Sequence, residues 1–303
     1  MEAVAVMTAC ACKGAHQAPD SNMDLDSLLS GLGVISPYAA EIAGIDDNAD
    51  DAIPRLTIAI ANDPKLTARM LGLANSTALS PGRPIESVRQ AVMGLGTDLT
   101  KATCVAMMVS EGTRGRTTTF DRRGAWTHAM LVALAARDIA KLTPLEIAPG
   151  TAYSAGLLHD IGYLVLAAKL PAQIACLCGR VEGDPDSRSM DLERMCLPAP
   201  HHAVGAVIGR AIGLPTTIVD AILYHHHPTA PQPARPLAAC VAVADQLTGL
   251  VHGAENPGFY LGGDEIEPSW LSMLKLDRPA LDPVLARLQE ELADIRSIAN
   301  QIA

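Results

Sequence analysis

The chain has 303 residues, of which 49 % are hydrophobic, 18 % charged and only 3 % aromatic. This composition excludes wholesale disorder and favours packed α-helices over a β-sandwich or barrel. The length suits one large domain or two closely packed ones. The formal net charge of −10 disfavours nucleic acids and anionic membrane surfaces as partners, because both are bound largely through Lys and Arg. Seven cysteines without a Cys-x-x-Cys pair, no export signal and no segment near the ~20 apolar residues of a membrane span predict a cytoplasmic protein.

Punctuation by Pro, Gly and capping residues divides the chain into a leader and a series of helices. Residues 1–22 lack a helical period and collect turn-forming residues, so we predict a flexible leader. Asp63-Pro64 is a strong start signal, because Asp caps a helix and Pro suits its first position. Helices are predicted over 24–32, 37–45, a stretch that ends near Asn62, a stretch that starts at Asp63-Pro64, 84–94, 97–111, 121–142, 151–168, 200–212, 215–227, 234–250 and 281–302.

A change of composition near residues 112–120, which are rich in Gly, Thr and Arg, indicates an internal linker. It separates an N-terminal helical lobe, residues 23–115, from a C-terminal helical lobe, residues 116–303, that ends in an amphipathic helix. Residues 179–200 and 253–280 are expected to form longer loops or short helices. No alternating run is long enough to predict a strand. The expected fold class is therefore all-α.

The histidines are unevenly distributed, because seven of the nine lie between positions 128 and 227. Asp160 directly follows one of them, and Asp245 lies inside the apolar stretch VAVADQL, where an ionised carboxylate is costly unless it is paired or binds a metal. Neutral imidazoles and carboxylates are the ligands of Zn, Fe and Mn sites. The set expected to share one site is His128, His159, Asp160, His201, His225, His226 and Asp245.

The adjacent pair His159-Asp160 limits the geometry of such a site. Successive residues of a helix point about 100° apart, so these two side chains cannot both aim along one line. They can flank one metal, or the carboxylate can bridge two ions about 3.5–4 Å apart. The same geometric restriction applies to the adjacent pair His225-His226.

GLLHDIGYLVLA, residues 156–167, resembles the signature of HDOD domains, which are output modules related to the HD phosphohydrolases. Residues 63–96 resemble the N-terminal half of the same family. The match continues in the expected order through segments that start at residues 126, 201, 221 and 239, and covers roughly residues 26–250. The resemblance implies an all-α fold in which a small N-terminal helical lobe packs on an HD-type bundle, so that residues 116–303 form the HD-like lobe with its C-terminal helix.

By the same resemblance, metal-dependent HD and HD-GYP relatives assign a ligand role to each candidate residue. His128 resembles the first ligand, His159 and Asp160 the eponymous pair, and Asp245 the closing aspartate. His201 fits the next position better than His202 does, and His225 and His226 resemble the paired histidines, with His227 as the spare. The implied cofactor is one or two divalent metal ions (Fe, Mn or Zn).

Three departures from the enzymatic relatives argue against hydrolysis. Tyr163 stands where HD-GYP enzymes carry Lys, which removes a cation that helps to stabilise a phosphoryl transition state. The segment after His226 lacks Gly-Tyr-Pro, and Gly124 replaces the Glu that is associated with a third metal. The resemblance therefore favours a centre that binds metal without catalysing hydrolysis.

Three hypotheses remain open. The first is a regulatory HDOD output module of signal transduction, without hydrolase activity, that contacts protein partners and binds a small molecule in the groove between the lobes; any metal is then structural or sensory. The second is a metal-dependent phosphohydrolase that acts on a nucleotide or cyclic dinucleotide, against which the missing Lys and the acidic surface count. The third is a structural domain whose histidines pair with carboxylates and backbone carbonyls without an ion.

Overall fold

The computed structural model describes residues 37–47, 49–76, 84–113, 120–183, 189–252 and 266–302, and every regular element in these ranges is helical. The all-α prediction is confirmed. The predicted leader 1–22, the predicted helix 24–32 and most of the predicted linker 112–120 lie outside the described residues. In these ranges the α-helices are α2 (Pro37–Ala43), α3 (Ala52–Ala61), α4 (Pro64–Ala74), α5 (Val88–Leu95), α6 (Thr97–Gly112), α7 (Arg122–Leu142), α8 (Pro149–Leu158), α9 (Ile161–Lys169), α10 (Pro171–Gly183), α11 (Ser189–Cys196), α12 (His201–Ala211), α13 (Thr216–Tyr224), α14 (Arg235–His252), α15 (Pro268–Leu274) and α16 (Asp282–Ile302), and η3 (Pro279–Leu281) is a 3₁₀ turn.

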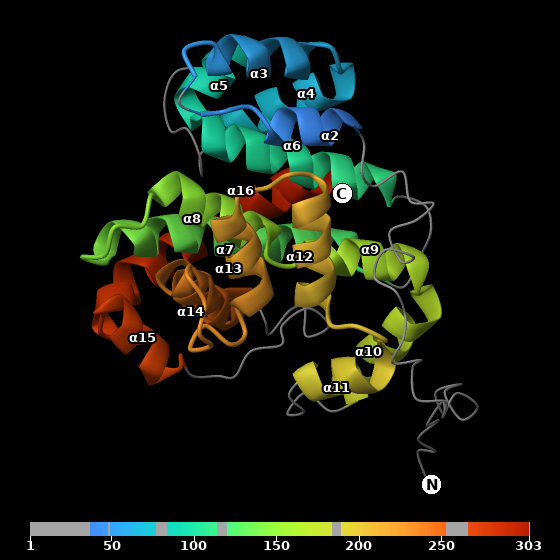
Figure 1. The fold of residues 1–303 in the computed structure, drawn as a ribbon, viewed down its shortest axis with the longest axis vertical. Helices are drawn as coiled ribbons and strands as arrows, with labels where there is room; N and C mark the ends of the chain where they lie inside the picture. Colours follow the sequence, from blue (N-terminus) through green and yellow to red (C-terminus); the bar gives the residue numbers. More distant parts are fainter. Residues whose placement is uncertain are drawn as a thin grey trace, which may run out of the picture.

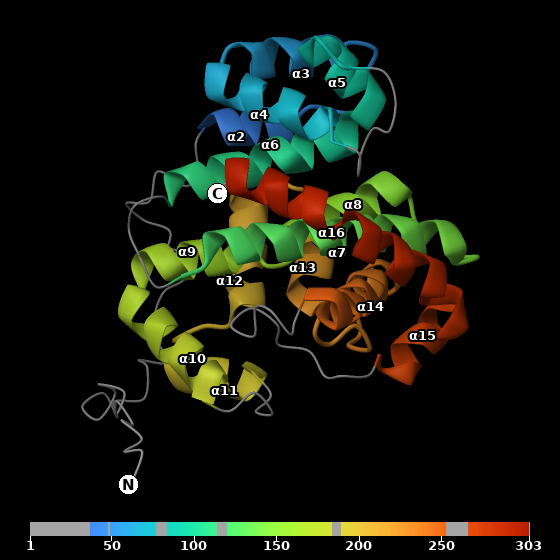
Figure 2. The same cartoon turned by 180° about the vertical axis from the view of Figure 1, so that it is seen from behind.

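The helices α2 to α6 form a compact group above the remaining helices, and α6 lies at the boundary between the two groups (Figures 1 and 2). Across this boundary α6 packs on α8 and α9, while the last helix, α16, contacts α4 as well as α7. We call α2–α6 the N-terminal lobe and α7–α16 the C-terminal lobe.

Capping residues explain where helices of the N-terminal lobe begin. The Asp63 carboxylate accepts hydrogen bonds from the backbone N–H groups of Lys65 and Leu66, and Pro64 follows it at the first position of α4. Helix α5 begins at Val88, later than predicted, because Ser87 and Gln90 form a reciprocal capping box.

Helix α7 is the centre of the C-terminal lobe. It packs on α8, α14 and α16, so its side chains are buried nearly all round, including those of Leu131, Val132 and Leu134. The amphipathic C-terminal helix was predicted from residue 281 and runs from Asp282 to Ile302, with Ile295 in the core.

Two helix predictions in the C-terminal lobe are wrong. The helix predicted over 151–168 is interrupted, because α8 ends at Leu158, His159 and Asp160 form a turn, and α9 starts at Ile161. The helix predicted over 215–227 stops at Tyr224, so His225 and His226 lie in a turn as well. In the region 179–200, expected to form longer loops or short helices, the short helix α11 is present, whereas α10, which ends there at Gly183, was not predicted.

Among the described residues no single helix is long and apolar enough to cross a membrane, although two sharply bent helix pairs, α5 with α6 and α8–α9 with α10, meet the length and composition requirements together.

Candidate metal centre

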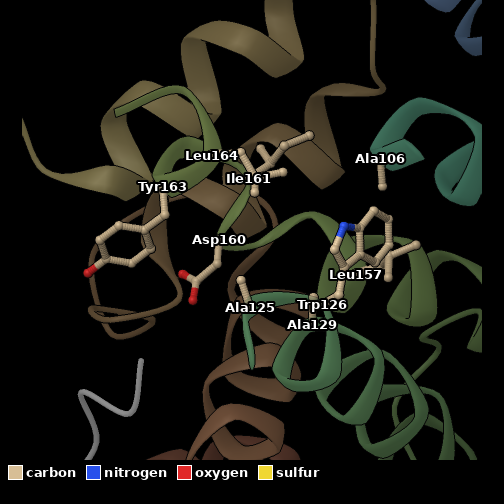
Figure 3. Close-up of a pocket in the computed structure, with 9 residues that line it drawn as sticks. All are labelled: Ala106, Ala125, Trp126, Ala129, Leu157, Asp160, Ile161, Tyr163 and Leu164. Carbon is tan, nitrogen blue, oxygen red and sulfur yellow. The ribbon is translucent and has the colours of Figure 1, made fainter. Parts of the chain in front are cut away.

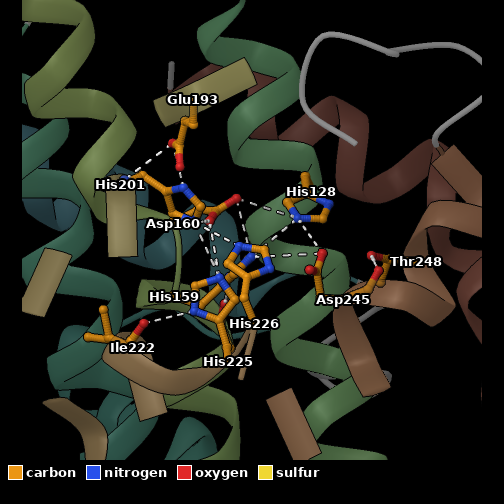
Figure 4. A network of polar contacts seen from close by, with 11 residues as sticks. His128, His159, Asp160, Glu193, His201, Ile222, His225, His226, Asp245 and Thr248 are labelled. Carbon is orange, nitrogen blue, oxygen red and sulfur yellow. Dashed lines mark hydrogen bonds and ion pairs between the residues drawn. The ribbon is translucent and has the colours of Figure 1, made fainter. Parts of the chain in front are cut away.

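Seven side chains that are far apart in the sequence converge on one cluster in the C-terminal lobe (Figure 4). They come from α7, from the turn between α8 and α9, from the first residue of α12, from the turn after α13 and from α14. The sequence-predicted set is thereby brought together completely: His128, His159, Asp160, His201, His225, His226 and Asp245. Their role as metal ligands stays a prediction.

One half of the cluster contains His128, His159 and Asp245. The Nε2 atoms of the two histidines are 3.3 Å apart, and Oδ1 of Asp245 lies 3.1 Å from Nε2 of His128 and 4.0 Å from that of His159. One potential ligand atom from each of these three residues lies within 4.8 Å of the other two. Two nitrogens and one oxygen in this arrangement are a donor set that divalent transition metals accept.

The other half contains the paired histidines and the first residue of α12. Nε2 of His201 lies 3.3 Å from Nε2 of His225 and 3.1 Å from Nε2 of His226. His202, which the sequence reasoning set aside, is partly exposed and lies near enough to form a potential ligand group with His201 and His226. His227 is exposed.

Asp160 stands between the two halves, and its two oxygens face different histidines. Oδ2 lies 3.3 Å from Nε2 of His159 and 3.7 Å from that of His128. Oδ1 lies 3.0 Å from Nε2 of His201 and 3.8 Å from that of His225. This is possible because His159 and Asp160 form a turn instead of continuing a helix. A carboxylate with one oxygen toward each donor group is suited to bridging two ions.

Hydrogen bonds on the outer side of three rings orient the cluster. Nδ1 of His159 is 2.7 Å from the carbonyl oxygen of Gly156, and Nδ1 of His225 is 2.8 Å from that of Ile222. Because a carbonyl can only accept, both Nδ1 atoms carry the hydrogen, and in the neutral rings Nε2 presents its lone pair to the cluster. The same arrangement is typical of histidines that bind metals.

For the third ring the outer partner is Glu193, a residue that the sequence reasoning missed. Its Oε1 lies 2.7 Å from Nδ1 of His201 and accepts the backbone N–H of the same residue at 3.2 Å. Glu193 is 0 % exposed although it lies on the short helix α11. A carboxylate of this kind orients the imidazole and increases its basicity toward a metal.

A close approach of two helices places His201 beside the turn. A Cβ atom built on Gly162 would lie only 2.0 Å from the carbonyl oxygen of His201 and 2.9 Å from the backbone nitrogen of Gly205. Only glycine at position 162 therefore lets α9 pack this closely on the start of α12. The glycine of the HDIG segment thus has a steric role in bringing His201 to Asp160.

Tyr163 occupies the space next to His201. The two rings are stacked with centroids 4.3 Å apart and an interplanar angle of 15°. Burial and the neighbouring carboxylates of Glu193 and Asp160 raise the pKa of the Tyr163 hydroxyl well above its usual value, so this side chain is neutral at physiological pH. The residue that replaces the lysine of HD-GYP enzymes therefore supplies no positive charge here.

The two aspartates of the cluster are ionised. Burial alone would raise the pKa of Asp160, but His159 and His201 hold it well below its usual range. The pKa of Asp245 is also lowered, because the hydrogen bond and charge of His128 outweigh burial. Two partly buried carboxylates therefore keep their negative charge in the centre of the lobe.

The three histidines of the second donor group differ in protonation, because His201 is protonated and His225 and His226 are neutral. Burial opposes protonation of His201, yet the carboxylates of Glu193 and Asp160 raise its pKa to about 10. Burial and the neighbouring His226 lower the pKa of His225 well below its usual value, and burial together with His201 lowers that of His226 to about 3. Two neutral imidazoles thus keep lone pairs available for a cation.

The donor set fits a transition metal. Nε2 of His201 lies 3.3 Å from Nε2 of His225 and 3.1 Å from Nε2 of His226, and the outer hydrogen bond of His225 directs the lone pair of its Nε2 inward. Facing lone pairs repel unless a proton or a cation lies between them. Imidazole nitrogens together with carboxylate oxygens suit Zn, Fe and Mn, which are the metals expected from the sequence.

A narrow apolar pocket lies beside the cluster at the boundary between the lobes (Figure 3). The cavity has a volume of about 30 Å³ and opens to solvent, and Asp160 is its ionised lining residue. The lining residues come from α6, α7, α8, the turn and α9, and include no Lys or Arg: Ala106, Ala125, Trp126, Ala129, Leu157, Asp160, Ile161, Tyr163 and Leu164.

Fold and cluster together define an all-α protein of the HD type. The profile of the HDOD domain matches residues 32–228, about two thirds of the chain, and the chain therefore belongs to the HDOD domain family. The resemblance inferred from HDIG and its neighbouring segments is confirmed. Asp245 lies beyond the matched range.

Solved structures support the assignment. An HDOD domain protein of unknown function from Geobacter sulfurreducens is 27 % identical with a TM-score of 0.73, over 92 % of this chain and 97 % of that one. Two further structures share the fold. A candidate signal transduction protein from Marinobacter aquaeolei VT8 is 24 % identical with a TM-score of 0.76, over 91 % of this chain and 60 % of that one. A candidate phosphohydrolase from Shewanella amazonensis SB2B is 23 % identical with a TM-score of 0.69, over 92 % of this chain and 98 % of that one.

Among curated proteins, an uncharacterized protein of Treponema pallidum (strain Nichols) is 25 % identical over 218 residues, which are 72 % of this chain and 42 % of the relative. The chain thus spans about four-tenths of the length of that relative.

Proposed function

We propose that this protein is a regulatory output module of signal transduction whose HD-type centre binds one or two divalent metal ions without hydrolysing a phosphoester. The observation that supports it most directly is the cluster itself: all seven donor side chains face one another, while Tyr163 is stacked on His201 where a catalytic cation is needed. The module acts through contacts with protein partners.

The metal would be held by the residues already described. His128, His159 and Asp245 supply one donor group, and His201, His225 and His226 the other, with Asp160 between them. A bound divalent ion supplies positive charge that offsets the two partly buried carboxylates. Glu193 and the carbonyl groups of Gly156 and Ile222 orient the rings from outside.

The proposed site for a small ligand is the pocket between the lobes. Its lining is almost entirely apolar, with Trp126 and Leu164 on its walls and the carboxylate of Asp160 as its ionised group. It suits a molecule with a narrow apolar part. Because α6 and α9 both line it, occupancy would alter the contact between the lobes.

Metal content tests the first part of the proposal. Anaerobically purified protein is expected to contain close to one or two equivalents of Fe, Mn or Zn by elemental analysis. Asp245→Ala and His226→Ala are expected to lose metal and to melt at a lower temperature. The matched control is His227→Ala, because His227 is the exposed neighbour of His226. Metal-free wild-type protein that stays empty in the presence of each ion would refute the metal centre.

A second candidate function, a metal-dependent phosphohydrolase, is favoured by one observation: the oxygens of Asp160 face two separate donor groups, as two-metal hydrolysis requires. Metal-loaded protein should be incubated with a generic phosphodiester and with cyclic dinucleotides. Turnover that disappears in Asp160→Ala would overturn the regulatory proposal. Stoichiometric metal without turnover would exclude the hydrolase, and folded protein that binds no metal would leave only a structural role.

A further inference from the structure

Three of the seven cysteines lie on the helical hairpin formed by α10 and α11: Cys176, Cys178 and Cys196. Sγ of Cys176, on α10, is 3.8 Å from Sγ of Cys196, the last residue of α11. Both side chains are partly exposed, so a small oxidant reaches them from solvent. From this geometry we infer that Cys176 and Cys196 are a redox pair that a hydroperoxide converts to a disulfide.

The other described cysteines differ in the features that matter for this chemistry. Cys104 and Cys240 are completely buried, and burial raises the pKa of Cys240 to about 12, which keeps it a thiol. Cys178 is only two residues from Cys176, but two residues along a helix correspond to about 200°, so it points away from α11. Because Cys178 is also partly exposed, it is an internal control for Cys176.

The reaction balances with the hydroperoxide as sole oxidant. The thiolate of one cysteine attacks a peroxide oxygen and becomes a sulfenic acid, while the O–O bond breaks and one water leaves after protonation. The second thiol then attacks the sulfenic sulfur, the S–S bond forms and a second water leaves. Overall, two thiols and one hydrogen peroxide give one disulfide and two waters. Since a disulfide needs about 2.05 Å between the sulfurs, the pair closes by a modest side-chain and helix adjustment.

The position of the pair connects it with the metal centre. Within the described part of the chain, α11 packs mainly on α10, and the thiols lie at this contact. Glu193 is three residues before Cys196 on the same short helix, and its carboxylate holds both Nδ1 and the backbone nitrogen of His201. A covalent link between α10 and α11 therefore keeps Glu193 against His201. This consequence, unlike disulfide formation itself, rests on the proposed metal centre.

The test begins with full-length, metal-free protein treated with hydrogen peroxide, followed by alkylation, trypsin and mass spectrometry. We expect the peptide of residues 170–180 to be linked to that of residues 195–210. Cys178→Ser is expected to form this link at the wild-type rate, and Cys176→Ser and Cys196→Ser to form none. A link that persists in Cys176→Ser, or wild-type cysteines that proceed to sulfinic acid without any link, would overturn the inference.

A second measurement separates this inference from the proposed function. Oxidised and reduced protein are loaded with Zn²⁺ and mixed with a chelator, and we expect release from the oxidised form to be several-fold slower, with no difference between oxidised and reduced Cys196→Ser. Equal release rates, despite a mapped disulfide, would overturn the link to His201. Protein that forms the disulfide but binds no Zn²⁺ would refute the metal centre and leave the redox pair established.

Discussion

The two lobes solve the problem of burial in different ways. In the N-terminal lobe the interior is apolar, with Ile42, Leu56 and Ile60 completely buried, and ion pairs such as that of Arg69 with Glu111 are partly exposed. The centre of the C-terminal lobe contains imidazoles and carboxylates, among them the completely buried His159 and Glu193. Charged groups in that position are expensive to bury, whereas aliphatic side chains stabilise the fold directly.

This difference indicates that the two lobes have different tasks. A core built only for stability has no need of seven converging imidazole and carboxylate side chains, and a cluster of charged groups inside the protein is a common sign of function. The N-terminal lobe packs through α6 against α8 and α9, the helices on either side of the His159-Asp160 turn. Changes that separate stability from metal binding in the two lobes therefore test the comparison.

The largest effect is expected from Gly162→Ala in the C-terminal lobe. The added Cβ would collide with the backbone of α12 at the carbonyl of His201, so the helix must move. We expect a loss of about 3 kcal/mol in unfolding free energy and a loss of metal uptake, measured by thermal melting and elemental analysis. Gly179→Ala is the control, because that glycine is exposed on α10 with no atom within 4 Å of the new Cβ; it should keep its metal and become slightly more stable. Wild-type metal content in Gly162→Ala would contradict the steric role.

The next effect is expected at Glu193, which orients His201 from outside the cluster. Glu193→Ala should weaken metal binding about 10- to 100-fold, as measured by competition with a chromogenic chelator. Glu193→Gln should recover much of the affinity, because its amide oxygen can still accept from Nδ1 and the backbone N–H. A remote control is Glu291→Ala, which removes an ion pair with Arg287 on α16. Equal affinities for all variants would show that His201 needs no outer partner.

Much of the fold could be predicted from the sequence because local signals and packing agree there. The Asp63-Pro64 start and the long helices α6, α7 and α16 match the predicted ranges within one or two residues at each end. The cluster residues could be chosen because the histidines gather between positions 128 and 227 and a carboxylate lies inside an apolar stretch, and because HDIG and its neighbouring segments resemble a known family.

The missed features depend on tertiary contacts. Nothing in the apolar run around His159 and Asp160 predicts a break, since its residues are compatible with a helix; the turn is stable where both side chains find partners from α7, α12 and α14. Glu193 lies in a short, polar helix and resembles an ordinary surface residue. In the sequence only its position, eight residues before His201, connects Glu193 with the cluster, and this spacing alone does not predict a contact.

A smaller, pH-dependent effect is expected where the lobes meet. Burial, with the hydrogen bond and charge of Asp47, raises the pKa of Asp98 to about 6, although Lys101 opposes the shift. Asp98 binds its proton more tightly in the folded protein than in the unfolded chain. Its contribution to stability is therefore complete below about pH 4 and is lost as the pH rises through about 6.

Asp98→Asn has no charge and can still donate a hydrogen bond to Asp47. The variant should therefore match the wild type near pH 4 and exceed its stability by about 1 kcal/mol at pH 7–8, a value reduced for solvent screening of this half-exposed carboxyl. Urea unfolding at both pH values measures the difference. A constant difference between the two pH values would mean that Asp98 titrates normally.

The smallest effect is expected at a helix cap in the N-terminal lobe, far from any buried charge. Ser87→Ala removes the side-chain acceptor for the Gln90 N–H and breaks the capping box of α5. Because this cap is exposed, we expect a loss of about 0.5 kcal/mol, and Ser87→Asp should restore it. Metal affinity should be unchanged in both variants, because α5 packs on α3, α4 and α6. Among the described residues it has no contact of similar extent with a helix of the C-terminal lobe. A shift in metal affinity on loss of this cap would show that the N-terminal lobe is coupled to the cluster as a whole, and the separation of tasks between the lobes would have to be abandoned.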